Sequence, residues 1–333
     1  MTRKFLILGV FFLTAGAVTA DDEVTPQAAQ VDVQAPVESD AVTGPAGAAQ
    51  EAPQESPQPQ EPTKAATEAE PELPPLDPSK LRGMRSAAAL VVEQQQERPL
   101  YAKNTDVPMP IASITKLMTA MVVLDAQLPL DEEITISKED VDTLRGTRSK
   151  LKVGLNLTRR ELLQLALMAS ENRAAAALAR TYPGGVPAFI AAMNRKAEAL
   201  DMMDSRFVDP TGLNSGNVAT AQDLVKMVKA SYDYELIREF TTTPSYAVEL
   251  RKRRNLPFHN SNLLVRSKRW DIGLSKTGYI RDSGRCLVMQ AKIAEQAVII
   301  VLLDSWGKYT RIADANRIKR WIETSLAYKP HSS

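Results

Sequence analysis

Hydrophobic and polar positions follow two different periods along the chain, and the change of period predicts the order of its elements. Apolar residues run through 87–92 and again through 99–101, with a polar turn at 93–98, which predicts two strands. Between about 111 and 232 the apolar positions recur every three or four residues, as on one face of a helix. Towards the C-terminus we expect strands at 270–280, 286–293 and 297–303 and a final helix at 311–326.

Strands at both ends of this order, with helices between them, indicate an α+β fold. We expect one antiparallel sheet, formed by the N- and C-terminal strands, with an all-helical lobe inserted between the two groups of strands. Side chains from both parts can then meet in the cleft between the sheet and the lobe.

The first 77 residues differ from the rest in composition. Residues 1–20 have a basic start at Arg3 and Lys4, an apolar run and a small-residue end, which is typical of a secretory signal peptide. An uncleaved anchor is the alternative, although the apolar run is shorter than the ~20 residues of a membrane span. Residues 21–77 are rich in Pro, Ala, Gln and Glu, so we expect a disordered linker. The globular domain then covers 78–333.

Charge is divided unevenly between these parts. Residues 21–77 hold thirteen acidic residues and one lysine, a net charge of −12, while the whole chain carries +1. With +2 in the first twenty residues, the remainder carries about +11. This balance favours an anionic partner, and an exported protein would meet a wall polymer or a membrane surface, not nucleic acid. The basic run 251–254 is typical of a solvated face, and no later segment is apolar enough to cross a membrane.

Three short motifs carry the chemistry of the chain. They are Ser113–Lys116, of the form S-x-x-K, Ser170–Asn172, of the form S-x-N, and Lys276–Gly278, which reads K-T-G. In this order they indicate an acyl-transfer enzyme with a serine nucleophile and a lysine as its base. A histidine is a poor candidate for the base, since the chain has only two histidines and His331 is two residues from its end.

Local context separates Ser113 from two other S-x-x-K matches. Ser113 opens a run with apolar residues at helical spacing, so Lys116 lies one turn on and within reach of the serine hydroxyl. Ser149 lies in a basic loop-like stretch and Ser305 follows a strand-like run. A simple helix cap would share the geometry of Ser113, and the order of the three motifs favours catalysis over a cap.

The S-x-N motif falls between two helical runs. A capping box at Thr158–Glu161 starts the first run, and an Ala-rich run follows Asn172. The motif therefore occupies a loop between helices, where side chains can project into a cleft. Taken alone, it would be read as a second helix cap.

The K-T-G motif falls in the strand expected at 270–280. A glycine at 278 lets a substrate backbone approach closely. Lys276 supplies positive potential and Thr277 a hydroxyl donor, which suit an anionic carboxylate. The alternative is an edge strand with an exposed lysine.

The single cysteine, Cys286, allows no internal disulfide, so stability must come from a packed core. It precedes an apolar run and is expected to be a buried small residue, not a nucleophile. One cysteine and two histidines leave no cluster with the spacing of zinc ligands, and we expect neither a metal nor a cofactor.

With these motifs, the chain resembles the low-molecular-mass penicillin-binding proteins, the serine D-alanyl-D-alanine peptidases. The resemblance covers about residues 85–328. It is carried by 110–120, 167–175, 209–214 and 273–279. Two further stretches, Phe258–Asn260 and Gly284–Val288, are similar to the DD-endopeptidase branch.

The resemblance implies a fold and a role for each matching residue. The fold is of the β-lactamase and DD-peptidase type, an antiparallel sheet flanked by N- and C-terminal helices with an inserted helical lobe. Ser113 is the acylated nucleophile, Lys116 its base, and Ser170 relays a proton to the leaving amine. The backbone N–H groups of Ser113 and Tyr279 form an oxyanion hole. Substrate binding falls to Asn172, to Lys276 and Thr277 for the terminal carboxylate, and to Gly278 and Tyr279.

Several functions remain open after this resemblance. We favour a periplasmic DD-endopeptidase that cuts peptide cross-links in peptidoglycan and is inhibited by β-lactams, over a DD-carboxypeptidase that removes terminal D-alanine. The sequence ends directly after the last expected helix, without the C-terminal β-rich domain and amphipathic anchor of many carboxypeptidase relatives. A β-lactamase needs a carboxylate to activate water, and Asp209 is the one loose candidate. A non-catalytic wall-binding or β-lactam-sensing module would not need Lys116.

Overall fold

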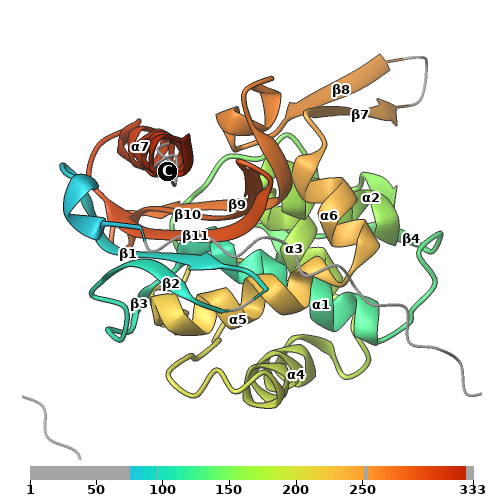
Figure 1. Cartoon of the computed structure of the whole chain (residues 1–333). Helices are drawn as coiled ribbons and strands as arrows, with labels where there is room; N and C mark the ends of the chain where they lie inside the picture. The colour runs from blue at the N-terminus through green and yellow to red at the C-terminus, as the bar shows by residue number, and fades with distance from the viewer. Residues whose placement is uncertain (1–75, 96, 251–253, 328–333) are drawn as a thin grey trace, which may run out of the picture. The chain divides into compact units, whose positions relative to one another are not determined.

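A five-stranded antiparallel sheet, built from both ends of the domain, carries the rest of the structure (Figure 1). The computed structural model describes residues 76–95, 97–250 and 254–327, which belong to one unit of the chain. The predicted signal peptide and all but two residues of the predicted linker lie outside them. The sheet has the order β2–β1–β11–β10–β9. These strands are β1 (Ser86–Glu93), β2 (Pro99–Lys103), β9 (Asp271–Ile280), β10 (Gly284–Ile293) and β11 (Gln296–Ser305).

The sheet is apolar on both faces because each face has its own core. Alternate side chains point to opposite faces of a strand, so β1 sends Leu90 to one core and Val91 to the other. One core lies against the C-terminal helix α7 (Thr310–Ala327), through residues such as Ile318. The other lies against the helical lobe, whose helix α5 (Ala221–Tyr232) packs on β11 and β1. Figure 1 shows the sheet between α7 and α5.

The lobe is organised around α1 (Lys116–Asp125). Eight consecutive residues of this helix, Lys116–Val123, are buried, which is typical of a helix surrounded by others. The other helical elements of this part are α2 (Arg159–Gln164), the π-helical turn η4 (Leu165–Ala169), α3 (Asn172–Arg180), α4 (Gly185–Ala199) and α6 (Glu235–Thr242). The sheet, the inserted helices and the final helix therefore agree with the α+β arrangement expected from the sequence.

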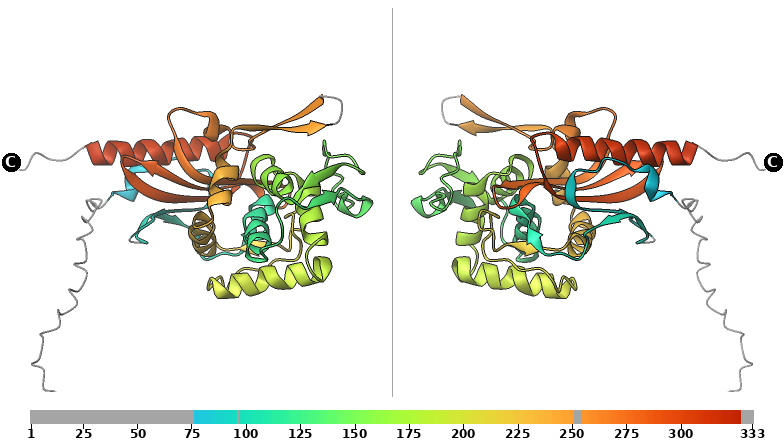
Figure 2. Two further views of the ribbon diagram at one scale, coloured as in Figure 1. Left: turned by 90° about the vertical axis from the view of Figure 1, so that its right-hand side faces the viewer. Right: turned by 90° about the vertical axis from the view of Figure 1, so that its left-hand side faces the viewer.

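The lobe also contains short strands that the sequence did not predict. The pairs are β3 (Met109–Pro110) with β6 (Val218–Ala219) and β4 (Glu133–Thr135) with β5 (Asn156–Thr158). Strands of two or three residues are too short for an alternating pattern to appear. A longer hairpin, β7 (Ser245–Leu250) with β8 (Arg254–His259), projects from the domain (Figure 2).

Packing at the N-terminal end of the described chain begins with Leu76, two residues before the expected boundary. Leu76 packs against the core below α7, and the Asp77 carbonyl oxygen accepts a hydrogen bond of 3.0 Å from the indole of Trp321. The N-terminal helical element among the described residues is a single 3₁₀ turn, η1 (Pro78–Lys80), capped by Asp77. None of the helices in the described ranges is both long and apolar enough to span a bilayer.

Candidate active site

The S-x-x-K motif forms a tight turn that leads into the central helix. Ser113 lies in the 3₁₀ turn η2 (Ala112–Thr115), and Lys116 is the first residue of α1. Ala112, directly before the serine, has a φ of 47°, a left-handed conformation that is unusual for a residue with a Cβ. The sequence placed Ser113 in the first turn of a helix, and the structure shows that this turn is 3₁₀.

Lys116 is fully buried and contacts three oxygen atoms. Its Nζ lies 2.8 Å from the Ser113 Oγ, 2.8 Å from the Asn172 Oδ1 and 2.7 Å from the Thr211 carbonyl oxygen. Burial lowers the pKa of Lys116 to about 7, although the negative charges of Asp209 and Glu171 oppose that shift. A lysine with this pKa is neutral in a useful fraction at neutral pH, so it can accept the proton of the serine.

The S-x-N motif brings a second serine to the same place. Ser170 has a φ of 61° and links η4 to α3, which turns its side chain out of the helical path. Its Oγ lies 2.8 Å from the Nζ of Lys276. The site therefore contains two serine–lysine pairs: Ser113 with Lys116 at the start of α1, and Ser170 of the lobe with Lys276 of the sheet.

Lys276 is buried, which rules out the alternative of an exposed lysine on an edge strand. Its Nζ donates to the Thr277 carbonyl oxygen at 3.1 Å as well as to Ser170. Burial lowers the pKa of Lys276 well below its usual value, and the nearby charges of Lys116 and Arg311 lower it further. Strand β9 is nonetheless an edge strand, so its outer backbone groups are unpaired by the sheet and face the cleft.

Asn172 connects the base to a neighbouring loop. Its Oδ1 accepts from Lys116, and its Nδ2 donates to the Thr147 Oγ1 at 3.0 Å. That loop is closed by Asp142, whose carboxylate accepts from the backbone N–H and the hydroxyl of Thr147. Arg145 in the same loop forms an ion pair with Asp282 between β9 and β10. Asn172 thus holds the lysine through its amide in this structure.

The K-T-G strand lies directly against the turn that carries Ser113. A Cβ added at Gly278 would be 2.7 Å from the Ile111 carbonyl oxygen and 3.2 Å from the Ser113 nitrogen. We expected the glycine to let a substrate backbone approach closely. In the structure, the lack of a side chain at Gly278 lets the backbone of the segment that carries Ser113 approach it. The Thr277 Oγ1 lies 2.8 Å from the Ser261 Oγ, and Tyr279 is exposed with the Arg285 guanidinium over its ring.

Arg311 is a part of the site that the sequence analysis missed. Its guanidinium donates to the carbonyl oxygens of Gly278 at 3.0 Å and Cys286 at 3.4 Å, and its buried Nε has no partner among the described residues. Burial, and then the charge of Arg285, lowers the pKa of Arg311 to about 10. In the sequence Arg311 is one more basic residue at the start of a helix, so no local signal distinguishes it.

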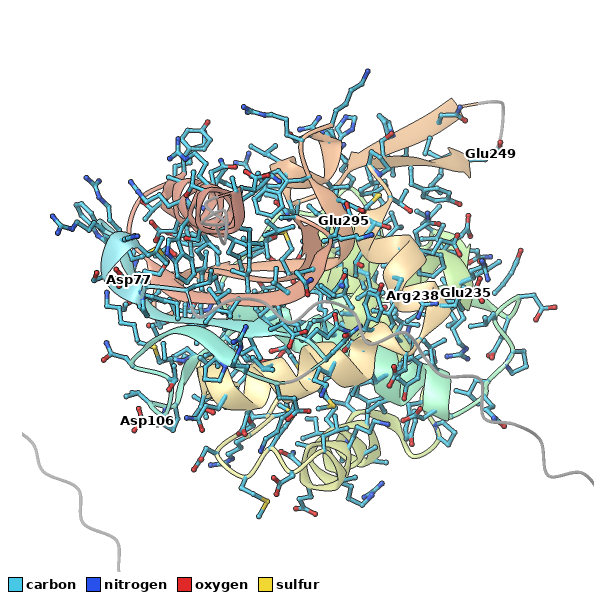
Figure 3. All side chains as sticks on the ribbon, in the orientation of Figure 1. Asp77, Asp106, Glu235, Arg238, Glu249 and Glu295 are labelled. Atoms are coloured by element: carbon cyan, nitrogen blue, oxygen red, sulfur yellow. The ribbon has the colours of Figure 1, made fainter. Side chains whose placement is uncertain are left out.

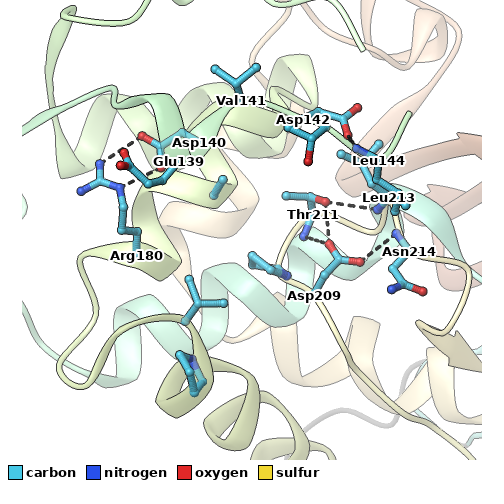
Figure 4. A pocket seen from close by; sticks show the side chains of 15 residues that line it. Glu139, Asp140, Val141, Asp142, Leu144, Arg180, Asp209, Thr211, Leu213 and Asn214 are labelled. Carbon is cyan, nitrogen blue, oxygen red and sulfur yellow. Dashed lines mark hydrogen bonds and ion pairs between the residues drawn. The ribbon is translucent and has the colours of Figure 1, made fainter. Parts of the chain in front are cut away.

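Asp209 acts as a turn residue. Its carboxylate accepts from the backbone N–H groups of Thr211 and Asn214 and from the Thr211 hydroxyl, as Figure 4 shows. It also accepts from the backbone N–H of Gly212. It therefore shapes the loop whose Thr211 carbonyl binds Lys116. A pocket of about 510 Å³ lies beside this loop. Its lining also includes Asp140 and Arg180, which form an ion pair with each other.

The other residues considered as candidates in the sequence analysis make structural contacts instead. Ser149 donates to Glu171 at 2.7 Å, and the Ser305 Oγ lies 2.7 Å from the Ser86 Oγ, so neither lies beside a lysine amine. Cys286 is fully buried, as expected, and burial raises the pKa of its thiol to about 11. In the described part of the chain no group of three or more His, Cys, Asp or Glu side chains is arranged to hold a metal ion.

Comparison with known proteins agrees with this geometry. The family model described as D-alanyl-D-alanine carboxypeptidase matches residues 76–307. The chain belongs to this family. D-alanyl-D-alanine endopeptidases of Pseudomonas aeruginosa and Escherichia coli are 50% and 47% identical to it over 242 and 240 residues. These alignments cover 72% of this chain in both cases, and 78% and 77% of the two relatives.

Other members of the family are more distant. The D-alanyl-D-alanine carboxypeptidase DacF of Bacillus subtilis is 31% identical over 238 residues, which cover 69% of this chain and 60% of that protein. The crystal structure of the Streptomyces K15 DD-transpeptidase superposes with a TM-score of 0.67 at 28% identity, covering 73% of this chain and 98% of that one. The fold is thus that of the DD-peptidases, and the chain is a serine-type D-Ala-D-Ala peptidase related to bacterial cell-wall enzymes.

Proposed function

We propose that this chain is a DD-endopeptidase that cleaves D-alanyl cross-links between the stem peptides of peptidoglycan. The observation that carries the proposal is the pair formed by Ser113 and Lys116, in which a buried amine with a pKa of about 7 lies 2.8 Å from a serine hydroxyl. The two relatives that share about half of the aligned residues carry the endopeptidase name.

The reaction begins with acylation of the serine. Neutral Lys116 accepts the proton of Ser113 while the serine oxygen attacks the carbonyl carbon of the D-alanyl bond. The negative oxygen that forms is stabilised by the backbone N–H groups of Ser113 and Tyr279. The C–N bond then breaks as Ser170 donates its hydroxyl proton to the leaving amine and takes up in its place the proton that Lys116 accepted. Water hydrolyses the ester in a second step and releases Ser113.

The carboxylate of the leaving residue binds on the side of the scissile bond that lies opposite the acyl group. Arg311 provides positive charge, Thr277 provides a hydroxyl donor, and the Lys276 amine provides N–H donors beside Ser170. This arrangement fixes the direction of the substrate along β9. The leaving side lies at Thr277 and the acyl side lies beyond Tyr279.

The alternative function is that of a DD-carboxypeptidase, which releases terminal D-alanine through the same acyl-enzyme. Its support is the family description and the carboxypeptidase relatives at 31% identity. The two functions differ in what is attached to the leaving amine, a single D-alanine or a second stem peptide.

We place this reaction in the periplasm. In that proposal residues 1–20 are a cleavable signal peptide, 21–77 are a linker and 78–333 are the peptidase domain. The partners are peptidoglycan stem peptides, with β-lactam antibiotics as covalent inhibitors. The proposed reaction needs no cofactor and no metal.

Purified cross-linked muropeptide dimers and uncross-linked pentapeptide monomers test the proposal. We expect the enzyme to convert dimers to monomers faster than it trims pentapeptides, with products identified by mass. Release of free D-alanine without any cleavage of dimers would assign the carboxypeptidase function instead.

A further inference from the structure

A hollow lies beside the β7–β8 hairpin. It has a volume of about 340 Å³. We call it the lysine groove. It is lined by Lys150, Lys152, Leu155, Leu250, Asn255 and Leu256. One wall comes from the segment before β5 and the other from the hairpin, which Figure 2 shows as a projecting arm.

Each wall of the lysine groove is linked, through a neighbouring residue, to a segment of the candidate site. On the lobe side, Ser149 binds Glu171, the neighbour of Ser170, and Lys150 follows directly. On the hairpin side, Ser261 follows the end of β8 and contacts Thr277. The Ser261 backbone also donates to the Met168 carbonyl oxygen at 2.9 Å, which ties the base of the hairpin to the loop of Ser170.

Lys150 joins the two walls across the groove. Its Nζ donates to the Pro257 carbonyl oxygen at 2.6 Å and lies 5.2 Å from the centre of the Phe258 ring. The side chain therefore holds a fixed position although it is exposed, and its ammonium keeps donors for a ligand.

The groove has an excess of positive charge. Among the described residues, neither Lys150 nor Lys152 forms an ion pair, and the Arg173 guanidinium lies close by, bound to the Leu151 carbonyl oxygen at 2.6 Å. The acids beside these walls are Glu171, which accepts from Ser149, and Glu249, which is paired across the hairpin with the lining residue Asn255 towards its outer end (Figure 3). An anionic and partly apolar ligand fits this surface.

We propose that the lysine groove binds the leaving stem peptide of a cross-linked substrate, with Lys150 and Lys152 pairing with its free carboxylates. This inference rests on the proposed function. A carboxypeptidase substrate ends at the carboxylate beside Thr277, whereas a cross-linked substrate continues from that point as a second peptide. The groove is thus used by cross-linked substrates and not by pentapeptides.

The charge-removing substitutions Lys152→Gln and Lys150→Gln test this assignment. We expect each to lower kcat/KM on purified dimers roughly two- to fivefold, mainly through KM, since exposed ion pairs are individually weak. The double substitution and Lys152→Glu should lower it further. The acylation rate with penicillin and the rate on pentapeptide should stay unchanged, because neither ligand reaches the groove. Lys80→Gln, beside α7 and outside the groove, is the matched control.

The outcomes separate this inference from the function on which it rests. If the wild-type enzyme cleaves no dimers, the proposed endopeptidase function is wrong. If it cleaves dimers and the lysine variants cleave them equally well, the groove assignment is wrong. Equal losses on dimers, pentapeptide and penicillin would also overturn it, because they would show a general effect on the catalytic residues.

Discussion

At the scale of single residues, the site is built from two serine–lysine pairs that are withdrawn from water. Lys116 pairs with Ser113, and Lys276 pairs with Ser170. Burying an ammonium group is costly unless it is compensated, and a lysine responds by losing its proton more readily. Burial is the main cause of the lowered pKa of both lysines. In the proposed mechanism this burial lets Lys116 act as the base without any histidine.

Replacing Ser113 by alanine should remove the peptidase activity while the fold remains. The acyl-enzyme cannot form without the serine oxygen, so we expect a loss of about 10³-fold or more on muropeptide substrates. Ser149→Ala is the control, because the Ser149 hydroxyl binds Glu171 and not a lysine. Substantial activity in a folded Ser113→Ala enzyme would place the nucleophile elsewhere.

The acylation rate should rise with pH through about 7. Lys116 must be neutral to accept a proton, and its pKa is about 7, so the active fraction grows as the pH increases past that value. A pH profile of kcat/KM, or of penicillin acylation, measures this directly. A profile that is flat between pH 5.5 and 8.5 would show that Lys116 is not the base.

The sequence motifs pointed to residues that the structure brings together, but not to all of their contacts. Ser113, Lys116, Ser170 and Lys276 are found because each lies in a short motif. Arg311 was missed, since its position is set by the packing of α7 against the end of the sheet. Contacts of this kind depend on the tertiary fold and leave no local pattern.

At the scale of elements, the turn η2, which carries Ser113, is held between two glycines from distant segments. A Cβ at Gly212 would lie 1.9 Å from the Ala112 carbonyl oxygen, and one at Gly278 would lie 2.7 Å from that of Ile111. Both contacts are with backbone atoms, which cannot move aside as a side chain can. The two glycines therefore fix the position of η2, while α1 fixes its direction.

Gly212→Ala should displace this turn and slow acylation. The added methyl group would overlap the Ala112 backbone, and the residue also has a φ of +79°. Gly146→Ala is the control, because Gly146 has a φ of +62° but no atom within 4 Å of an added Cβ. We expect Gly146→Ala to cost about 1 kcal/mol of stability with a normal acylation rate.

Thermal unfolding and penicillin acylation together distinguish the two glycine variants. A loss of about 1 kcal/mol lowers the melting temperature by about 2–4 °C in a domain of this size. Gly212→Ala should lose more stability than Gly146→Ala and should also acylate slowly. Equal behaviour of the two variants would show that the close approach at Gly212 has no role in placing Ser113.

The elements that the sequence predicted are the long ones with a clear period. The strands β1, β10 and β11 and the helix α7 were expected within a few residues of their observed bounds. The hairpin β7–β8 and the short strands of the lobe were not, because exposed or very short strands show little alternation. The lysine groove lies between two of these less predictable segments.

At the scale of the whole molecule, the two parts of the chain carry net charges of opposite sign. Residues 78–333 carry about +11 and residues 21–77 carry −12. A basic domain is attracted to an anionic polymer, and this attraction is screened by salt. Cleavage of the intact wall should therefore depend on ionic strength more than the chemical step does.

Raising salt from about 0.05 M to 0.5 M should slow release of muropeptides from purified sacculi more than it slows penicillin acylation. The β-lactam is small and reacts at a buried pair, so its rate reports the site alone. Parallel rates over this range of salt would show that the basic surface does not contribute to binding of the wall.

The central claim is that Ser113 is the acylated nucleophile of a DD-peptidase, and brief exposure to penicillin followed by intact-protein mass spectrometry tests it most directly. The opened β-lactam ring stays attached, and Asp209 is occupied by its own loop and is not free to activate water. We therefore predict a long-lived adduct that maps to Ser113 and is absent from Ser113→Ala. An unshifted mass with rapid consumption of the drug would indicate a β-lactamase, and an adduct on another serine would contradict the account.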